Sequence, residues 1–495
     1  MGRIDLDAVA ALPGTPECIE AFNWVRGWLE DDTRYEAVPI RSARHAPTPD
    51  FSEADVQALL DYGSIARIHR NDVRGHVHMF TVDEPHKERR RIIKHTVDVN
   101  NVLGKETLLP VKLPTKRDIA DLVWAGDSCI TLDFSAYYDQ LRYADDVATR
   151  FCFRVGSDYY RLVTMSMGQR QTTDCASHTT ARFLDYEKQG ASRAIIDGAA
   201  FAGSTSTVVR DSTIYRDRAL ACGATFNEDV SDLSKLVVHE CDFGGVHLNF
   251  IDKTTCLTQK VVDKVKYSWS QREHWTWRGF ASHAGLLFWS WQLIELPMAE
   301  FYPLLRFIGE ISRKMTFDEL VWDEPAVIPD SVWPSLALWT GLAQRNRPMR
   351  VNSSNEPRWI VATDASSWGW GYCAINVDTN ELHTHGEPWS PAMHEKYGDL
   401  LGKSTFTEPQ ALLNAMVHLL PVDDPCIVRV LTDNTPTKYT FRRGFSSRSY
   451  HLNECARRLR EHFGPDFYFD VEYIPGEENP ADAYSRGYVE QCEEP

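Results

Sequence analysis

Four carboxylates near the C-terminus of the 495-residue chain lie at positions in predicted strands and helices from which they could take part in catalysis. Asp364 ends a β-rich run, and Glu408 lies in a segment with a helical pattern. Asp433 ends a second apolar strand, and Asp482 opens a final helix. If these different helices and strands bring their acids into one cluster, the carboxylates repel one another unless cations neutralise them. The pattern therefore predicts a pair of divalent metal ions that clamp the attacking and leaving oxygens of a phosphodiester.

Each acid taken alone has a simpler interpretation as a surface or capping residue, because the chain contains 70 aspartates and glutamates. Taken together, the words VATDASSWGWG, TEPQAL, VRVLTDN and YIPGEENPADAYSR resemble the RNase H domain of retroelement polymerases in content and in order. The resemblance covers residues 355–490 and implies an RNase H fold that cleaves the RNA strand of RNA–DNA hybrids. It also implies four metal ligands for two Mg2+ or Mn2+ ions: Asp364, Glu408, Asp433 and Asp482.

A second pair of acids lies in the N-terminal half. Asp133 ends the apolar strand CITLDF, where its side chain can point into a cleft, and Asp197 lies at a turn in AIIDGAAFAG. Two such acids can share two divalent metals that activate a primer 3′-hydroxyl and hold an incoming triphosphate. The alternative for each acid is that it only caps the end of a strand.

The sequence segments around this pair resemble those of reverse transcriptases over residues 50–260. The resemblance makes Asp133 and Asp197 catalytic metal ligands, and it places Arg91 on the phosphates of the incoming dNTP. CGATFNEDVSDLSK and DFGGVHLNF resemble the next two motifs of the family. The implied partners are an RNA template, a DNA primer, the RNA–DNA hybrid and dNTPs.

Two further residues match the same family, and each has two interpretations. Tyr138 is either the bulky residue that excludes a ribose 2′-hydroxyl or a half-buried aromatic of the palm. Gly168 in MSMGQRQ is either the glycine of the nucleotide pocket or a residue that permits a tight turn. A long helix is predicted after this turn, over residues 171–189.

One position departs from the family pattern. The catalytic turn of reverse transcriptases normally carries Tyr-x-Asp-Asp, and this chain has Ile195, Ile196, Asp197 and Gly198. The loss of one negative charge beside two divalent cations should weaken metal binding by roughly a kcal/mol or more. Glycine also adds backbone freedom to a turn that must hold Asp197 in place. The polymerase activity is therefore expected to be impaired but not excluded.

The order of predicted elements indicates an α/β (α+β) protein with more than one domain. We expect reverse-transcriptase fingers and palm with a helical connection, followed by an RNase H-like mixed sheet with flanking helices. The expected parts are an N-terminal lead-in (1–50), the fingers and palm (51–270), a helical thumb or connection (271–350) and the RNase H-like domain (355–490).

The formal charge of −17 opposes nonspecific binding of phosphates, so nucleic-acid affinity must come from local basic patches. One such patch is HKERRRIIK, which includes Lys87 and Lys94. Another follows Asp433, on two predicted helices, and includes Lys438 and Arg442. A charged run is often only a solvated face, but this one lies where the backbone of a hybrid would pass.

The bulk composition indicates a chain without membrane or disulfide features. The 11 cysteines include no CxxC pair, which is typical of reduced thiols in a cytoplasmic or nuclear protein. The most apolar stretch, AGLLFWSWQLIELPMAEF, is interrupted by Gln292 and Glu295, and no secretory signal is evident.

Three hypotheses about function follow. The first is a retroelement RNA-directed DNA polymerase with RNase H activity, of a DIRS-like or VIPER-like branch on the basis of wording such as MGQRQ. The second is a degenerate polymerase, with Gly198 in its catalytic turn, that retains only the RNase H activity. The third is a domesticated nucleic-acid-binding scaffold, which the intact set of four C-terminal acids disfavours, although folds outlive their chemistry.

Overall fold

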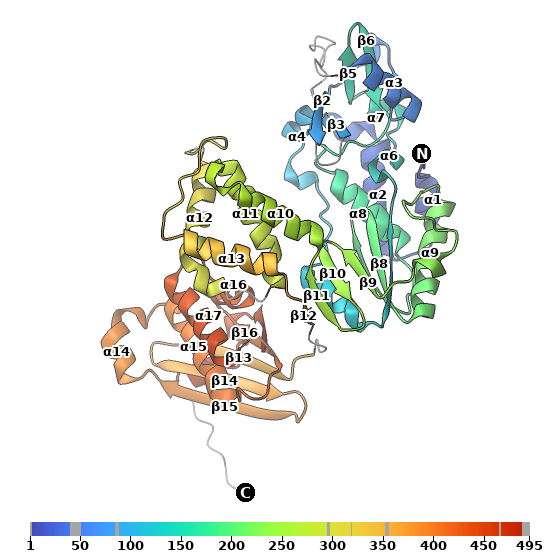
Figure 1. Cartoon of the computed structure of the whole chain (residues 1–495). Helices are drawn as coiled ribbons and strands as arrows, with labels where there is room; N and C mark the ends of the chain where they lie inside the picture. The colour runs from blue at the N-terminus through green and yellow to red at the C-terminus, as the bar shows by residue number, and fades with distance from the viewer. Residues whose placement is uncertain are drawn as a thin grey trace. The chain divides into compact units, whose positions relative to one another are not determined.

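The computed structural model describes residues 2–39, 51–84, 89–294, 298–317, 319–351, 356–464 and 467–487. The chain forms two compact units, Met1–Thr254 and Thr255–Pro495 (Figure 1). Among the residues that the structure describes, no helix has the length and hydrophobicity of a membrane span. The predicted part boundaries near residues 50, 270 and 350 are finer than this division and stay predictions.

An antiparallel three-stranded sheet carries the acids of the first unit. Its strands, in spatial order, are β4 (Ser128–Asp133), β8 (Gly198–Gly203) and β7 (Ala191–Ile195). Asp133 at the end of β4 lies opposite Gly198 at the start of β8. The hairpin that joins β7 to β8 carries Asp197, so the two predicted catalytic acids lie at the same edge of the sheet.

Two helices pack on this sheet. They are α8 (Thr172–Phe183), which contacts β7, and α9 (Thr205–Ala221), which contacts β8 and β4. The helix predicted over 171–189 is therefore too long at its C-terminal end. The backbone amides of Gln189 and Gly190 donate to the carboxylate of Asp211 at 3.0 and 2.9 Å, so this segment is held by a side chain instead of by helical hydrogen bonds.

The remaining strands of the first unit pair antiparallel in a small sheet and two hairpins. The sheet has the order β1 (Ile65–Arg67), β6 (Asp158–Leu162) and β5 (Cys152–Val155); the hairpins join β2 (His78–Glu84) to β3 (Arg89–His95) and β9 (Glu240–Phe243) to β10 (Val246–Asn249). The short helices are α3 (Glu53–Tyr62), α4 (Val97–Val102), α5 (Lys116–Ala120), α6 (Tyr137–Gln140) and α7 (Asp145–Ala148). Ser52 and Asp55 form a capping box at the start of α3.

The N-terminal residues belong to the core of the first unit. The helices there are α1 (Leu6–Ala11) and α2 (Pro16–Glu30). Phe22, Val25 and Trp28 of α2 are buried in the same cluster as the strands β4 and β8. The hydroxyl of the buried Tyr35 donates to the carbonyl of Trp28 at 2.9 Å and accepts from Gln169 at 3.0 Å. Residues 2–39 therefore support the sheet of β4, β8 and β7 by packing.

The second unit begins with helices that are rich in tryptophan. The helices are α10 (Gln259–Ser270), α11 (Trp277–Ser290), α12 (Tyr302–Thr316) and α13 (Trp333–Arg345), and the short strands β11 (Thr254–Leu257) and β12 (Met349–Arg350) flank them in sequence. The buried His283 of α11 joins three helices, because its ring nitrogens lie 3.1 Å from Ser268 Oγ and 3.0 Å from Thr340 Oγ1. Burial lowers the pKa of His283 to about 4, so the ring is neutral at pH 7.

A mixed five-stranded sheet completes the second unit. Its spatial order is β15 (Glu381–Pro388), β14 (Gly369–Asn376), β13 (Trp359–Ala365), β16 (Ile427–Thr432) and β17 (Tyr468–Tyr473). The first three strands are antiparallel neighbours, and β13, β16 and β17 are parallel neighbours. The helices are α14 (Pro391–Tyr397), α15 (Ser404–Leu419), α16 (Thr435–Arg443), α17 (Tyr450–Phe463) and α18 (Asp482–Ser485). Val361, Val428 and Val430 of the sheet are fully buried against Leu412 and Ala415 of α15.

Candidate active sites

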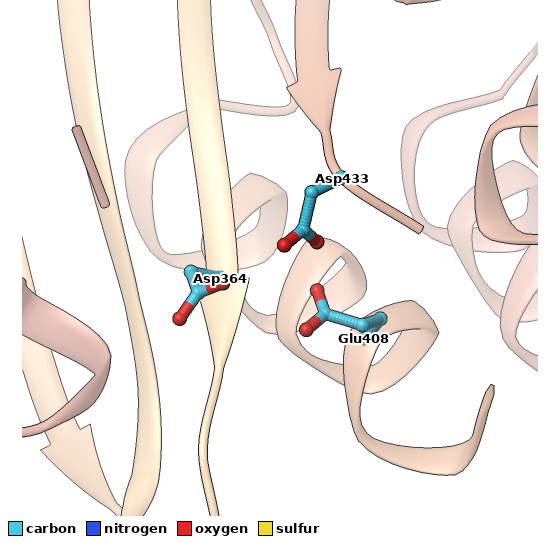
Figure 2. Close-up of side chains that lie close together, drawn as sticks. All are labelled: Asp364, Glu408 and Asp433. Atoms are coloured by element: carbon cyan, nitrogen blue, oxygen red, sulfur yellow. The ribbon is translucent and has the colours of Figure 1, made fainter. Parts of the chain in front are cut away.

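Three of the four predicted C-terminal acids converge. Asp364 lies on β13, Glu408 on α15 and Asp433 directly after β16, and their side chains point toward one another (Figure 2). One carboxylate oxygen from each residue lies within 4.8 Å of those of the other two. Asp364 is 5% exposed and Glu408 is 3% exposed. We call these three residues the acidic trio.

The sheet topology explains this convergence. Because β13 and β16 are parallel neighbours, with Ala362 opposite Leu431, their C-terminal ends lie at the same edge of the sheet. Asp364 and Asp433 therefore leave the sheet side by side. The helix α15 packs across β13, and the backbone amide of Ala365 donates to Oε1 of Glu408 at 3.3 Å.

Burial and mutual repulsion raise the pKa values of the acidic trio. Burial raises the pKa of Asp364 to about 6, and the charges of Asp433 and Asp482 act in the same direction. Burial, followed by the charges of Asp364 and Asp433, raises the pKa of Glu408 to about 9. Burial also raises the pKa of Asp433, with a smaller contribution from Asp482. The trio thus resists full ionisation unless a cation is present.

The donor set of the acidic trio fits a hard divalent cation. Carboxylate oxygens are the ligands that Mg2+ and Mn2+ prefer. The second oxygen of Glu408, Oε2, is buried and has no hydrogen-bond partner among the described residues. A buried acceptor of this kind is costly unless a ligand satisfies it, which makes Glu408 a fitting metal ligand.

The C-terminal segment supports Asp364 through residues that the sequence analysis did not select. The hydroxyl of Ser485 donates to Oδ2 of Asp364 at 2.5 Å. The side-chain amide of Asn479 donates to the carbonyl of Thr363 at 3.0 Å and lies 3.5 Å from Oδ1 of Asp364. Both residues belong to the motif NPADAYSR, and their place in this motif is the sequence feature that could have identified them.

The fourth predicted acid, Asp482, lies near the acidic trio but is not part of it. It opens α18, its side chain is 46% exposed, and Arg486 binds both of its oxygens at 2.8 and 2.9 Å.

Two glycines make room for α18 on the sheet. A Cβ on Gly371 would lie 2.7 Å from the Ser485 nitrogen, and one on Gly386 would lie 2.3 Å from the Tyr484 oxygen.

Asp133 and Asp197 also lie together, in the first unit. The amide of Phe134 donates to the carbonyl of Asp197 at 3.1 Å, which joins the β7–β8 hairpin to the end of β4. Burial, followed by the charge of Asp197, raises the pKa of Asp133 to about 6. Burial also raises the pKa of Asp197. The turn contains Ile196 with φ at +54°, a left-handed conformation that is uncommon for a β-branched residue.

Gly198 faces the carboxylate of Asp133. A Cβ built on Gly198 would lie 3.4 Å from Asp133 Oδ1, which is ordinary van der Waals contact. The backbone of Gly198 does not have a positive φ, so the position does not require glycine for conformational reasons. An aspartate at position 198, as in the Tyr-x-Asp-Asp turn of reverse transcriptases, would therefore project toward Asp133.

Two residues after α9 contact Asp133 and were not selected from the sequence. The side-chain amide of Asn227 donates to Asp133 Oδ2 at 2.9 Å. The carboxylate of Glu228 accepts from the backbone amide of Asp133 at 3.0 Å. Both lie in the word CGATFNEDVSDLSK, which the sequence analysis recognised only as a motif.

The three predicted substrate-binding residues of the first unit, Arg91, Tyr138 and Gly168, have different surroundings. Tyr138 is half-buried, and burial followed by the charge of Asp197 raises its pKa, so it lies near that acid. Arg91 of β3 is exposed, with Nη2 3.7 Å from the sulfur of Met167. A Cβ on Gly168 would lie 2.3 Å from the Lys94 oxygen, so this glycine is needed for close packing against β3.

The basic side chains of the second patch differ in their contacts. Lys438 and Arg442 lie on α16, directly after Asp433, and α16 also presents the exposed Tyr439. On α17, in contrast, Arg457 is held by Glu454 at 2.7 Å and by a further glutamate. In the first basic patch, Lys94 pairs with Asp139 at 2.9 Å, and Lys87 lies outside the described residues.

The sequence matches no protein-family model, and no curated protein matches it. Solved structures do match. The foamy viral protease-reverse transcriptase dRH in complex with double-stranded DNA has 13% sequence identity and a TM-score of 0.50, and the match covers 94% of this chain and 80% of that chain. The foamy viral protease-reverse transcriptase in complex with double-stranded DNA has 13% identity, a TM-score of 0.46 and coverages of 95% and 96%. The same viral protein in complex with an RNA/DNA hybrid has 12% identity, a TM-score of 0.48 and coverages of 99% and 64%.

The likeness is one of fold. It confirms the predicted fold class: the chain is an α/β (α+β) protein that has a reverse-transcriptase fold with a helical connection, followed by an RNase H-like mixed sheet.

Proposed function

We propose that the chain is a retroelement RNA-directed DNA polymerase with an RNase H activity. The acidic trio carries this proposal, because one oxygen of each carboxylate lies within 4.8 Å of the others and the buried Glu408 Oε2 has no partner among the described residues. The DIRS-like or VIPER-like branch stays a prediction from the sequence.

In the RNase H-like site, Asp364, Glu408 and Asp433 would hold divalent metal, and Asp482 would complete the second ion's shell after leaving Arg486. Two bound Mg2+ or Mn2+ ions would supply activation of water and stabilisation of the leaving oxygen. The chain's own residues prepare this site: Ser485 and Asn479 orient Asp364, and the amide of Ala365 orients Glu408. Lys438 and Arg442 are proposed to bind the backbone of the RNA–DNA hybrid.

In the polymerase-like site, Asp133 and Asp197 would hold the metals that serve the primer 3′-hydroxyl and the dNTP. Asn227 orients Asp133 through its 2.9 Å hydrogen bond. Arg91 is proposed to bind the triphosphate, and Tyr138, which lies near Asp197, is proposed to exclude a ribose 2′-hydroxyl. Gly168 supports the pocket by allowing the close approach of its loop to β3.

A second candidate function is an active RNase H joined to an inactive polymerase. Gly198 favours it, since one carboxylate of the family's catalytic turn is missing beside Asp133. The third hypothesis, a binding scaffold without activity, has less support because the acidic trio is complete.

Two assays on the full chain separate these functions. One is primer extension on an RNA template with dNTPs and Mg2+ or Mn2+, and the other is cleavage of a labelled RNA–DNA hybrid. Asp133→Asn should abolish only extension, and Asp364→Asn should abolish only cleavage. Cleavage without extension in the unsubstituted protein would favour the second function. Absence of both activities in folded protein would favour the scaffold.

A further inference from the structure

We propose that Glu228 supplies a third carboxylate to the polymerase-like site and so replaces the charge that is missing at Gly198. The inference rests on the proposed polymerase function, and it concerns a residue that lies outside the β7–β8 hairpin. It would explain how a site with glycine in its catalytic turn can still hold divalent metal.

The segment that carries Glu228 runs alongside the end of β4. Phe134 forms an antiparallel bridge with Phe226. The amide of Asn227 donates to the carbonyl of Asp133 at 2.9 Å, and the amide of Asp133 donates to Glu228 Oε2 at 3.0 Å. These contacts place the Glu228 carboxylate beside the backbone of Asp133 and make the placement independent of the β7–β8 turn.

Glu228 and position 198 flank Asp133 from opposite sides. Successive backbone amides of a strand point to opposite edges. The amide of Phe134 points to the hairpin and donates to Asp197, whereas the amide of Asp133 points to Glu228. The side chain of Asp133 follows the same division, since Oδ1 faces position 198 and Oδ2 accepts from Asn227.

The Glu228 carboxylate has capacity for a further ligand. Glu228 is half-buried, and its Oε1 has no hydrogen-bond partner among the described residues. Its charge also acts on Asp133, whose pKa it helps to raise after burial and Asp197. A carboxylate beside Asp133 adds to the negative potential that attracts a divalent cation.

A simpler role for Glu228 is to accept the hydrogen bond of the Asp133 amide. The substitution Glu228→Gln separates the two roles, because the glutamine oxygen can accept the same hydrogen bond but carries no charge. Asp229→Asn is a matched control. Asp229 is the next residue, is exposed, and accepts a hydrogen bond from the Ser231 amide at 3.0 Å that asparagine can also accept.

The test is metal-directed cleavage of the full-length protein. Fe2+ is added as the probe for divalent sites, ascorbate and peroxide generate hydroxyl radicals at the bound ion, and mass spectrometry locates the cut peptide bonds. Cuts near Asp133 and Asp197 report the polymerase-like site, and cuts near Asp364 report the acidic trio in the same sample. This readout does not require catalysis.

We expect Glu228→Gln to need about tenfold more Fe2+ for half-maximal cutting near Asp133, with unchanged cutting near Asp364. Asp229→Asn should match the unsubstituted protein. Equal Fe2+ dependence for Glu228→Gln and the unsubstituted protein would overturn the proposal, as would the absence of cuts near Asp133 in the unsubstituted protein. If the tenfold shift is seen but primer extension is absent, the polymerase function fails while the role of Glu228 in metal binding stands.

Discussion

The hydroxyl of Ser485 donates a 2.5 Å hydrogen bond to Oδ2 of Asp364, which joins the last helix of the described chain to the central strand of the C-terminal sheet. This bond favours the ionised form of Asp364 and so opposes the effect of burial on its pKa. The contact depends on the close packing of α18 against Gly371. A side chain near the C-terminus thus tunes an acid that lies more than 100 positions earlier in the sequence.

We predict that Ser485→Ala raises the pKa of Asp364 further and moves the rise of the pH–rate profile for hybrid cleavage to higher pH. The rate at pH 7 should fall about tenfold, a typical effect of losing a partner of a metal ligand. Ser390→Ala, which alters the cap of α14, is the control. An unchanged profile in Ser485→Ala would show that the hydrogen bond does not tune Asp364.

Each member of the acidic trio should be necessary for cleavage of the hybrid. Asp364→Asn and Glu408→Gln are expected to lower hybrid cleavage by more than about 100-fold, since each removes an oxygen ligand and a charge. Asp482→Asn should have a smaller effect because Asp482 is half-exposed and paired with Arg486. Single-turnover cleavage of a labelled hybrid measures all three. An equal loss for Asp482→Asn would mean that Asp482 joins the trio when substrate binds.

The raised pKa values of the trio predict how stability depends on pH without metal. A carboxyl with a higher pKa in the folded state stabilises fully below its unfolded pKa of about 4, and this contribution is lost as the pH rises through the folded pKa. The Tm of the second unit in EDTA should therefore fall as the pH rises through about 6 for Asp364 and about 9 for Glu408.

Two comparisons check this assignment. Glu408→Gln should flatten the decline of Tm between pH 6 and pH 9, because the substituted side chain no longer ionises. Added Mg2+ should raise the Tm more at pH 8 than at pH 5, because metal binding releases protons from the trio. A Tm in EDTA that increases over this range would contradict the pKa assignment.

Gly198→Asp should improve metal binding in the polymerase-like site. The new side chain would start 3.4 Å from Asp133 Oδ1, in ordinary contact and without backbone strain. We expect the Mg2+ concentration for half-maximal primer extension to fall about tenfold. Gly198→Asn is the control that adds the same volume without the charge. Equal effects of the two substitutions would show that rigidity of the turn, and not charge, limits the site.

The basic residues of α16 should bind substrate without taking part in chemistry. Lys438→Ala with Arg442→Ala should raise the KM for an RNA–DNA hybrid with little change in kcat, and should reduce the salt dependence of binding by about one unit of slope per side chain. Arg457→Ala is the matched control, because Arg457 is already paired with Glu454 at 2.7 Å. A similar loss in the control would indicate a general effect of net charge.

Local sequence patterns were enough to place most of the candidate acids on their strands and helices. Asp133 and Asp433 end apolar strands, and Glu408 lies in a helix, because local hydrophobic patterns are enough to define short strands and helices. The same local reasoning overestimated the helix that ends at Phe183. A carboxylate distant in sequence, Asp211, accepts the backbone amide of Gln189, the last residue of the predicted helix.

Which acids meet, and which residues support them, depends on contacts between segments that are far apart in the sequence. The parallel pairing of β13 and β16 brings Asp364 to Asp433, whereas Asp482 lies outside the trio and is paired with Arg486. Glu228 was unremarkable in the sequence, and its contact with Asp133 spans 95 positions. Hydrogen bonds and electrostatic repulsion act through space over a few ångströms, so no local pattern of residues specifies which distant partners they join.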